Sequence, residues 1–412
     1  MLHLNLHRLL RTALGALLLL GLAEANAAPK AYVGNFKDNT VSVIDSAAGV
    51  VTATIPIAAG PHGMGVTPDG RWLFVSGDAS TGVSVVDTAT DRVVQTIEVG
   101  KSPHGVALTP DGKQLLVGVY GDNRVAIVDI ASSAVVATVP VGNPHTIAIR
   151  PDGRFAYVAS QAPGKFALVV IDLATRAVTD SIALDKPARD LEFASNGKAL
   201  YFTLAGVNAV QVLDPGSNKV VAQIATGVSP HLATVFRGAT VGTAVVQGSG
   251  ELLLFDPATF APIKSIPVGK QPHWMASGDG KTVYVTNEGS NDVSVVDITS
   301  GLTRTIAVGN APRKVAVQAA PIPAAAAPKV LIVSISNFVF APAEIVIAAG
   351  GRVEWSNDDG APHGLAFKDG APGVDPLLPG ARFSRVFDLP GTYDYVCSVH
   401  PFMAGRVVVR AR

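Results

Sequence analysis

The 412-residue sequence contains one cysteine, Cys397, so no disulfide bond within the chain stabilises its fold. Lys+Arg and Asp+Glu number 32 each and no basic stripe is present, which excludes nucleic acid as a partner. No stretch reaches the roughly 20 apolar residues that a membrane-spanning helix requires. A nucleophile elbow, a phosphate-cradling glycine loop and a zincin motif are also absent, so several common enzyme classes have no support.

The N-terminus has the pattern of an export signal. Two arginines precede an apolar run at 13–22 and the small-residue sequence ANA at 25–27. This arrangement is typical of a Sec-type signal peptide over 1–27, cleaved after Ala27. The mature protein is therefore expected to be periplasmic or secreted. Cysteines usually pair in an oxidising compartment, so the lone Cys397 is accidental, intermolecular or bound to a ligand.

A repeat of 41 to 43 residues organises positions 28–318. Each unit has four alternating apolar runs, which predict the four-stranded antiparallel meander of one propeller blade. An aspartate closes the third run of every unit, and these seven residues are Asp45, Asp87, Asp129, Asp172, Asp214, Asp256 and Asp297. Six of them are followed three residues later by Ser or Thr, which favours a role in turns over a functional role. Seven aspartates predict seven blades.

The two ends of the repeat array complement each other. The first unit starts at Ala31 with a second-strand sequence, AYVGN, whereas APRKVAVQ at 311–318 supplies a first strand. Pairing these strands closes the ring and leaves no sheet edge exposed. The sequence VYVTN at 283–287 and the repeated PDGK/R turns resemble YVTN-type seven-bladed β-propellers. The resemblance implies the fold and no particular activity, because such propellers serve as scaffolds, binding modules and enzymes.

A change of composition separates a second domain from the propeller. The sequence AAPIPAAAAP at 319–328 is typical of a semi-extended linker. Residues 329–412 alternate apolar and polar positions between Gly and Pro turns, which predicts a small β-sandwich. The expected fold class is all-β, with a seven-bladed propeller followed by a β-sandwich.

The sandwich carries the lone thiol in the motif YDYVCSVHPFMAG at 393–405. Cys397, His400 and Met403 lie on one short loop between two strands, and His363 lies 34 residues upstream of the cysteine. Two imidazoles, a thiolate and a weak thioether form the blue-copper ligand set. The alternative is that Cys397 is a small buried hydrophobe and Met403 fills the core.

These residues resemble the cupredoxins, and among them amicyanin-like proteins with a short ligand loop. The resemblance implies one type 1 copper per chain, bound by His363, Cys397, His400 and Met403. Gly364 departs from the family pattern, which often places an asparagine after the first histidine to brace the ligand loop. The backbone N–H of Gly364 is still expected to reach the thiolate, but the side-chain brace is lost.

The resemblance also implies a surface for electron transfer. A histidine of such a loop has one ring edge facing solvent, here flanked by Pro362, Pro401 and Phe402. This apolar patch is expected to be the electron port and the docking surface for a redox partner protein, because weak redox encounters use small interfaces. The alternative is an ordinary exposed loop.

A second set of polar residues recurs at the entry to the first strand of each propeller unit. Seven equivalent positions hold five histidines and two arginines: His62, His104, His145, Arg189, His231, His273 and Arg313. Side chains directed towards the propeller axis would form a ring there. Several imidazoles favour a metal, whereas two permanently charged guanidiniums favour a small anion. The alternative is a structural dipeptide, copied with the blade, that bonds to the backbone of a neighbouring blade.

The order of the two domains resembles that of nitrous oxide reductases. That family requires two cysteines for its dinuclear electron-entry centre, and this chain has one. The sequence therefore predicts an exported copper-binding electron-transfer protein with the propeller as a docking or ligand-binding module. The alternative is a copper-dependent oxidoreductase with a second metal or small anion in the His/Arg ring.

Overall fold

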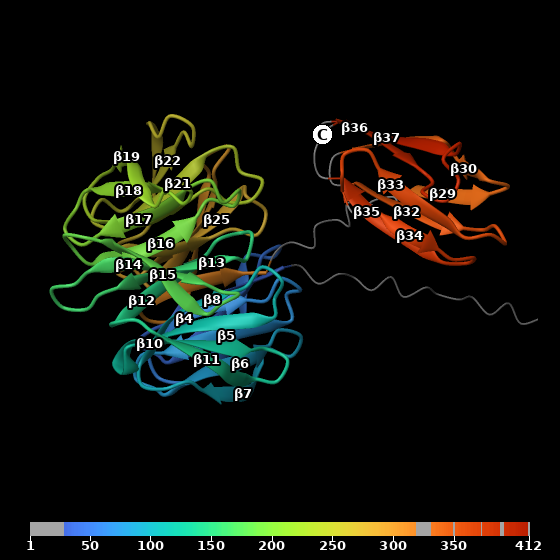
Figure 1. Cartoon of the computed structure of the whole chain (residues 1–412). Helices are drawn as coiled ribbons and strands as arrows, with labels where there is room; N and C mark the ends of the chain where they lie inside the picture. The colour runs from blue at the N-terminus through green and yellow to red at the C-terminus, as the bar shows by residue number, and fades with distance from the viewer. Residues whose placement is uncertain (1–28, 319–330, 349–350, 372, 388–390, 411–412) are drawn as a thin grey trace, which may run out of the picture. The chain divides into compact units, whose positions relative to one another are not determined.

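The computed structural model describes residues 29–318, 331–348, 351–371, 373–387 and 391–410. The predicted signal peptide, 1–27, and the predicted linker, 319–328, lie outside these residues. The chain divides into two compact units, Met1–Ala320 and Pro321–Arg412 (Figure 1). Within the described residues the regular structure consists of β-strands and one 3₁₀ turn, η1 (Tyr120–Asp122), so the all-β prediction is confirmed.

Seven four-stranded antiparallel sheets, the blades, make up the first unit. From the innermost strand outwards they are β28 (Pro312–Val317), β1 (Lys30–Asn35), β2 (Thr40–Asp45) and β3 (Val50–Pro56); β4 (Pro61–Val66), β5 (Trp72–Gly77), β6 (Gly82–Asp87) and β7 (Arg92–Glu98); β8 (Pro103–Leu108), β9 (Gln114–Val119), β10 (Arg124–Asp129) and β11 (Ala134–Pro140); β12 (Pro144–Ile149), β13 (Phe155–Ser160), β14 (Ala167–Asp172) and β15 (Ala177–Ala183); β16 (Ala188–Phe193), β17 (Leu200–Leu204), β18 (Ala209–Asp214) and β19 (Lys219–Ala225); β20 (Pro230–Thr234), β21 (Gly242–Val246), β22 (Glu251–Phe255) and β23 (Pro262–Pro267); and β24 (Pro272–Ala276), β25 (Thr282–Asn287), β26 (Asp292–Asp297) and β27 (Thr303–Ala307).

The innermost strands contact one another in a closed series, from β28 to β4 and onwards through β24 back to β28. The ring closes inside a single blade, where β1 pairs with β28 in antiparallel register, Val33 opposite Val315. Two further bonds hold this junction: Lys30 N donates to Gln318 Oε1 and Gln318 N donates to Lys30 O, each at 2.9 Å. The predicted closure is therefore confirmed.

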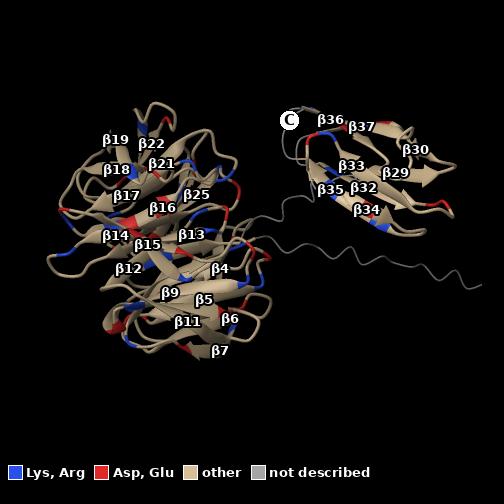
Figure 2. Cartoon of the chain, in the orientation of Figure 1, with Lys and Arg blue, Asp and Glu red and all other residues tan. Residues whose placement is uncertain are grey.

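Strand position in a blade explains the apolar runs of the sequence. Middle strands such as β5 and β6 are buried along almost their whole length because neighbouring blades cover both faces. Outermost strands such as β7 are exposed at nearly every residue. Charged residues lie mainly at strand ends and loops, with Lys and Arg interspersed among Asp and Glu (Figure 2).

The aspartates that close each third strand act in turns, as predicted. All seven accept a backbone N–H from a residue two or three positions further on. Asp129, for example, accepts from both N and Oγ of Ser132, at 2.8 and 2.6 Å.

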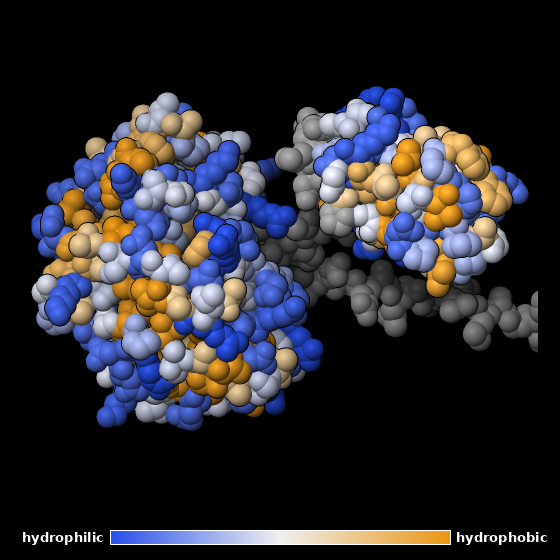
Figure 3. All heavy atoms as spheres, in the orientation of Figure 1, coloured by the Kyte–Doolittle hydropathy of each residue, from blue (hydrophilic) through white to orange (hydrophobic). Residues whose placement is uncertain are grey.

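The second unit is a sandwich of two sheets. One sheet has the order β30 (Val339–Ala341), β29 (Leu331–Ser336), β32 (Gly351–Asn357) and β35 (Arg382–Phe387). The other has the order β31 (Glu344–Ala348), β37 (Ala404–Arg410), β36 (Gly391–Val396), β33 (His363–Phe367) and β34 (Val374–Leu377). Their facing sides enclose a core built around Trp355, Phe387 and Tyr395. Apolar residues also reach the visible surface of this unit in several places (Figure 3).

Candidate metal centre

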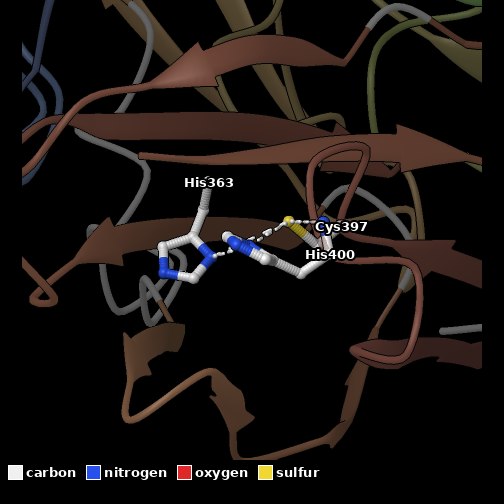
Figure 4. Close-up of side chains that lie close together, drawn as sticks. All are labelled: His363, Cys397 and His400. Atoms are coloured by element: carbon white, nitrogen blue, oxygen red, sulfur yellow. Dashed lines mark hydrogen bonds between the residues drawn. The ribbon is translucent and has the colours of Figure 1, made fainter. Parts of the chain in front are cut away.

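The predicted ligands of the sandwich meet at one end of the second sheet. His363 is the first residue of β33, and Cys397 immediately follows β36. The loop that leads from Cys397 to β37 folds back on itself: Cys397 N donates to Met403 O at 3.0 Å and Met403 N donates to His400 O at 2.9 Å. This turn brings His400 to Cys397 and His363 (Figure 4).

The three ligand atoms form a small triangle. Cys397 Sγ lies 3.7 Å from the Nδ1 atoms of both His363 and His400, and the two Nδ1 atoms are 3.3 Å apart. Ligands bound at about 2.0–2.3 Å to a tetrahedral metal ion lie roughly 3.3–3.8 Å from one another. The triangle therefore has the dimensions of a metal site. The side chains of Cys397 and His363 are fully buried, and Met403 is 3% exposed.

Asp359 fixes the orientation of the first imidazole. Its carboxylate lies 2.9 Å from His363 Nε2, and because a carboxylate only accepts, that nitrogen carries the proton. The lone pair of Nδ1 is then directed at the triangle. Backbone N–H groups of Phe338 and Asn337 also bind Asp359, and that of Phe338 is the main cause of the lowered pKa of this carboxyl. The sequence analysis did not select Asp359, although it lies four residues before His363.

Two backbone N–H groups are directed at the sulfur. Those of Gly364 and His400 lie 3.4 and 3.3 Å from Cys397 Sγ, so the bond predicted for Gly364 is confirmed. A Cβ atom at Gly364 would collide with the Ser398 hydroxyl and come within 3.1 Å of the Val374 carbonyl oxygen. The bracing asparagine of related proteins therefore has no room here, and hydrogen bonds to the sulfur come from the backbone.

A buried set of two imidazoles and a thiolate at one end of a β-sandwich defines the blue-copper class of electron-transfer proteins. Residues 329–410 match the family of copper binding proteins described as plastocyanin/azurin, and the chain belongs to that family. It is 45% identical over 83 residues to amicyanin-alpha of Methylorubrum extorquens, 19% of this chain and 69% of that protein. Against amicyanin of Paracoccus versutus it is 37% identical over 98 residues, 23% and 71% of the two chains. The cofactor is type 1 copper, and the protein exchanges electrons with a redox partner protein.

The propeller has relatives of its own. Residues 7–109 match the YNCE-like beta-propeller family. Among solved structures, hydrazine synthase of Kuenenia stuttgartiensis superposes with a TM-score of 0.59 at 22% identity, over 65% of this chain and 91% of that one. Dihydro-heme d1 dehydrogenase NirN, in complex with DHE, gives 0.55 at 16% identity, over 71% and 75%. Identities this low show the fold alone.

The residues expected at the electron port lie beside His400. Pro362, Pro401 and Phe402 are all exposed, Phe402 to 75%, and the Phe402 ring centroid lies 6.0 Å from that of half-buried His400. Phe338, 42% exposed, packs edge-on against His400 at 4.9 Å. The sequence analysis missed Phe338, because it is 62 residues from His400 and nothing local links the two.

The seven positions of the His/Arg ring are equivalent in the structure, since each is the second residue of an innermost strand. The five imidazoles form two stacks. Ring centroids of His62, His104 and His145 succeed one another at 3.7 and 4.1 Å, and those of His231 and His273 are 4.0 Å apart. The first stack needs the glycines that follow its histidines, because a Cβ atom at Gly63 or Gly105 would overlap the next blade's histidine carbonyl.

Some ring members also bond to a neighbouring blade, as the structural alternative expects. His104 Nδ1 lies 3.0 Å from His145 O, and His273 Nδ1 lies 3.0 Å from Arg313 O. A carbonyl oxygen only accepts, so both Nδ1 atoms carry protons and both Nε2 atoms keep a free lone pair. The structural role therefore leaves these imidazoles able to bind a ligand.

Charged residues that the sequence analysis missed lie next to the ring. Asp190 is 2% exposed and Lys314 is 5% exposed, with Asp190 Oδ1 3.9 Å from Lys314 Nζ and Asp190 Oδ2 2.6 Å from His231 Nδ1. Burial lowers the pKa of Lys314 to about 8 and raises the pKa of Asp190. A signal existed in the sequence, because only the two units with arginine in the ring, ARD and PRK, place a charged residue directly after it.

Proposed function

We propose that the protein is an exported electron-transfer protein whose single type 1 copper is bound by His363, Cys397 and His400, with Met403 as the weak axial ligand. The convergence of Cys397 Sγ and two imidazole Nδ1 atoms supports this assignment. Copper supplies one-electron redox chemistry when bound. The buried, hydrogen-bonded ligands hold one geometry for both oxidation states, so little reorganisation accompanies electron transfer.

Cys397→Ala should abolish the intense visible thiolate-to-copper absorption of the oxidised protein, because the thiolate is its source. Met403→Leu should keep the band and raise the reduction potential, because removal of the axial donor disfavours Cu(II). Absorption spectroscopy and voltammetry measure both effects. Ser398→Ala, at the exposed neighbour of the cysteine, is the control and should stay blue. A blue Cys397→Ala variant would exclude the assignment.

The electron port proposed at Pro362, Pro401 and Phe402 can be tested without a known partner. Phe402→Glu should slow electron self-exchange between oxidised and reduced protein at least tenfold, because two identical charges would meet in each encounter. NMR line broadening measures this rate. The control is Val386→Glu, also at an exposed valine (50%), which pairs with Arg352 at the other end of β32 from Asn357. Equal rates for both variants would exclude the port.

Export through residues 1–27 and cleavage after Ala27 complete this proposal. The described residues include no helix that is long and apolar enough to cross a membrane. Mass spectrometry of the protein isolated from the periplasm or medium should give a mature chain that begins at Ala28. Retention of the intact N-terminus in the cytoplasm would contradict export.

The propeller is proposed to be a docking or ligand-binding module. The gathering of five imidazoles at equivalent positions supports a second candidate function, a copper-dependent oxidoreductase with a further metal or small anion in the ring. Metal analysis separates the two: an electron-transfer protein with an empty propeller holds one copper per chain, whereas the enzyme requires additional metal.

A further inference from the structure

Two carboxylates occupy equivalent positions beside the His/Arg ring and differ in their neighbours. Asp78 directly follows β5, and Glu288 directly follows β25. Glu288 accepts two hydrogen bonds from the guanidinium of Arg313, at 3.0 and 3.1 Å. At the corresponding place beside Asp78 stands His104, whose Nε2 is 3.8 Å from Asp78 Oδ1. The protein supplies a cation to one carboxylate and an imidazole to the other.

The unpaired carboxylate is an expensive feature unless something binds it. Asp78 Oδ1 is buried without a hydrogen-bond partner among the described residues, and so is Nδ1 of His62, a side chain only 6% exposed. Burying polar atoms without partners costs about 1–3 kcal/mol each. Both atoms lie in one cluster with the free Nε2 of His104, because a ligand atom from each residue lies within 4.8 Å of the others.

The donor set indicates which ligand fits. Two neutral imidazoles and one carboxylate are ligands of divalent first-row transition metals, and three protein ligands leave one position open. The bond from His104 Nδ1 to His145 O is the outer contact that usually fixes a metal-binding histidine. An anion is disfavoured here, because it would meet the Asp78 carboxylate, while both ring arginines already bind groups of the protein, Arg313 at Glu288 and Arg189 at Ser229.

We propose that His62, Asp78 and His104 form a second metal site, which binds one divalent transition-metal cation, Zn²⁺ or Cu²⁺, at the axis of the propeller. The site deepens the ligand-binding role proposed above for the propeller and includes Asp78, which lies outside the ring predicted from the sequence. It is chemically distinct from the copper centre, since it contains no sulfur.

The test uses the full-length protein with copper loaded and reduced to Cu(I), so that the blue-copper site is filled. Titration with Zn²⁺ in a calorimeter should show one equivalent bound. Asp78→Asn and His104→Ala should each weaken this binding at least about 100-fold, more than is typical for loss of an outer contact. In the oxidised protein, a second equivalent of Cu²⁺ should add an electron paramagnetic resonance signal without any thiolate band.

His273→Ala is the matched control, because its imidazole lies beside the carboxylate that Arg313 already neutralises; it should bind Zn²⁺ as tightly as the unchanged protein. Circular dichroism of the metal-free variants checks their folding. Absence of a Zn²⁺ equivalent in the unchanged protein would overturn the site, and so would full binding by Asp78→Asn or an equal loss in His273→Ala. The visible band reports the copper centre separately, so failure of one assignment is distinguishable from failure of the other.

Discussion

At the scale of single residues, Asp190 and Lys314 place opposite charges inside the propeller. Each is at most 5% exposed, so each has lost most of its hydration. Such a pair contributes little net stability, but removing one member leaves the other charge buried without its partner. His231, 2.6 Å from Asp190, relieves only part of that cost.

Lys314→Met should therefore lower the free energy of unfolding by about 3 kcal/mol. Adding Asp190→Leu to Lys314→Met should recover much of this loss, because no unpaired charge then remains. Chemical denaturation of the full-length variants measures both changes. Lys113→Met is the control, since Lys113 lies the same 3.9 Å from Asp111 but is 78% exposed, and it should change stability by at most about 1 kcal/mol. A Lys314→Met protein as stable as this control would contradict the argument.

Residue-level prediction from sequence worked where chemistry is local. Cys397, His400 and Met403 are close in sequence, so their spacing alone identified a ligand loop. Asp78 lies 26 positions from His104, and the two meet only because adjacent blades pack together. No periodicity marks Asp78, since the equivalent residues of the other blades are mostly uncharged.

At the scale of elements, strand order and blade closure were predictable because apolar runs and turn aspartates recur with one period. The asparagine of the YVTN-like motif has a structural role that the sequence does not reveal. Asn287, fully buried at the end of β25, donates across the hairpin to Asp292 Oδ1 at 2.6 Å and Ser294 Oγ at 2.9 Å. Asn35 makes the equivalent bonds to Thr40 and Ser42 between β1 and β2.

Asn287→Ala should destabilise the protein by about 1–3 kcal/mol, because the buried Ser294 hydroxyl loses its partner. Thermal unfolding measures the effect. Asn196→Ala removes an asparagine that is exposed in a turn and should cost less than about 0.5 kcal/mol. Equal melting temperatures for the two variants would show that the cross-hairpin bonds are dispensable.

At the scale of the whole molecule, each unit has its own core. The sandwich core consists entirely of residues after position 330, and the seven blades enclose the remaining apolar clusters. We therefore predict that residues 329–412 fold alone into a soluble blue protein. Expression of this fragment, copper loading and absorption spectroscopy test the prediction, and a fragment that aggregates or stays colourless would show that it needs the propeller.

The blade shared by β1 and β28 has a consequence for the order of assembly. The two strands are held together by bonds between residues 288 positions apart, so β1 emerges from the ribosome or the export channel long before its partner. During that interval the edge of β1 is open to wrong partners, and pairing across such a sequence separation is slow. The propeller can close only when synthesis reaches residue 317, which makes the last blade strand the one that commits the domain to its native ring.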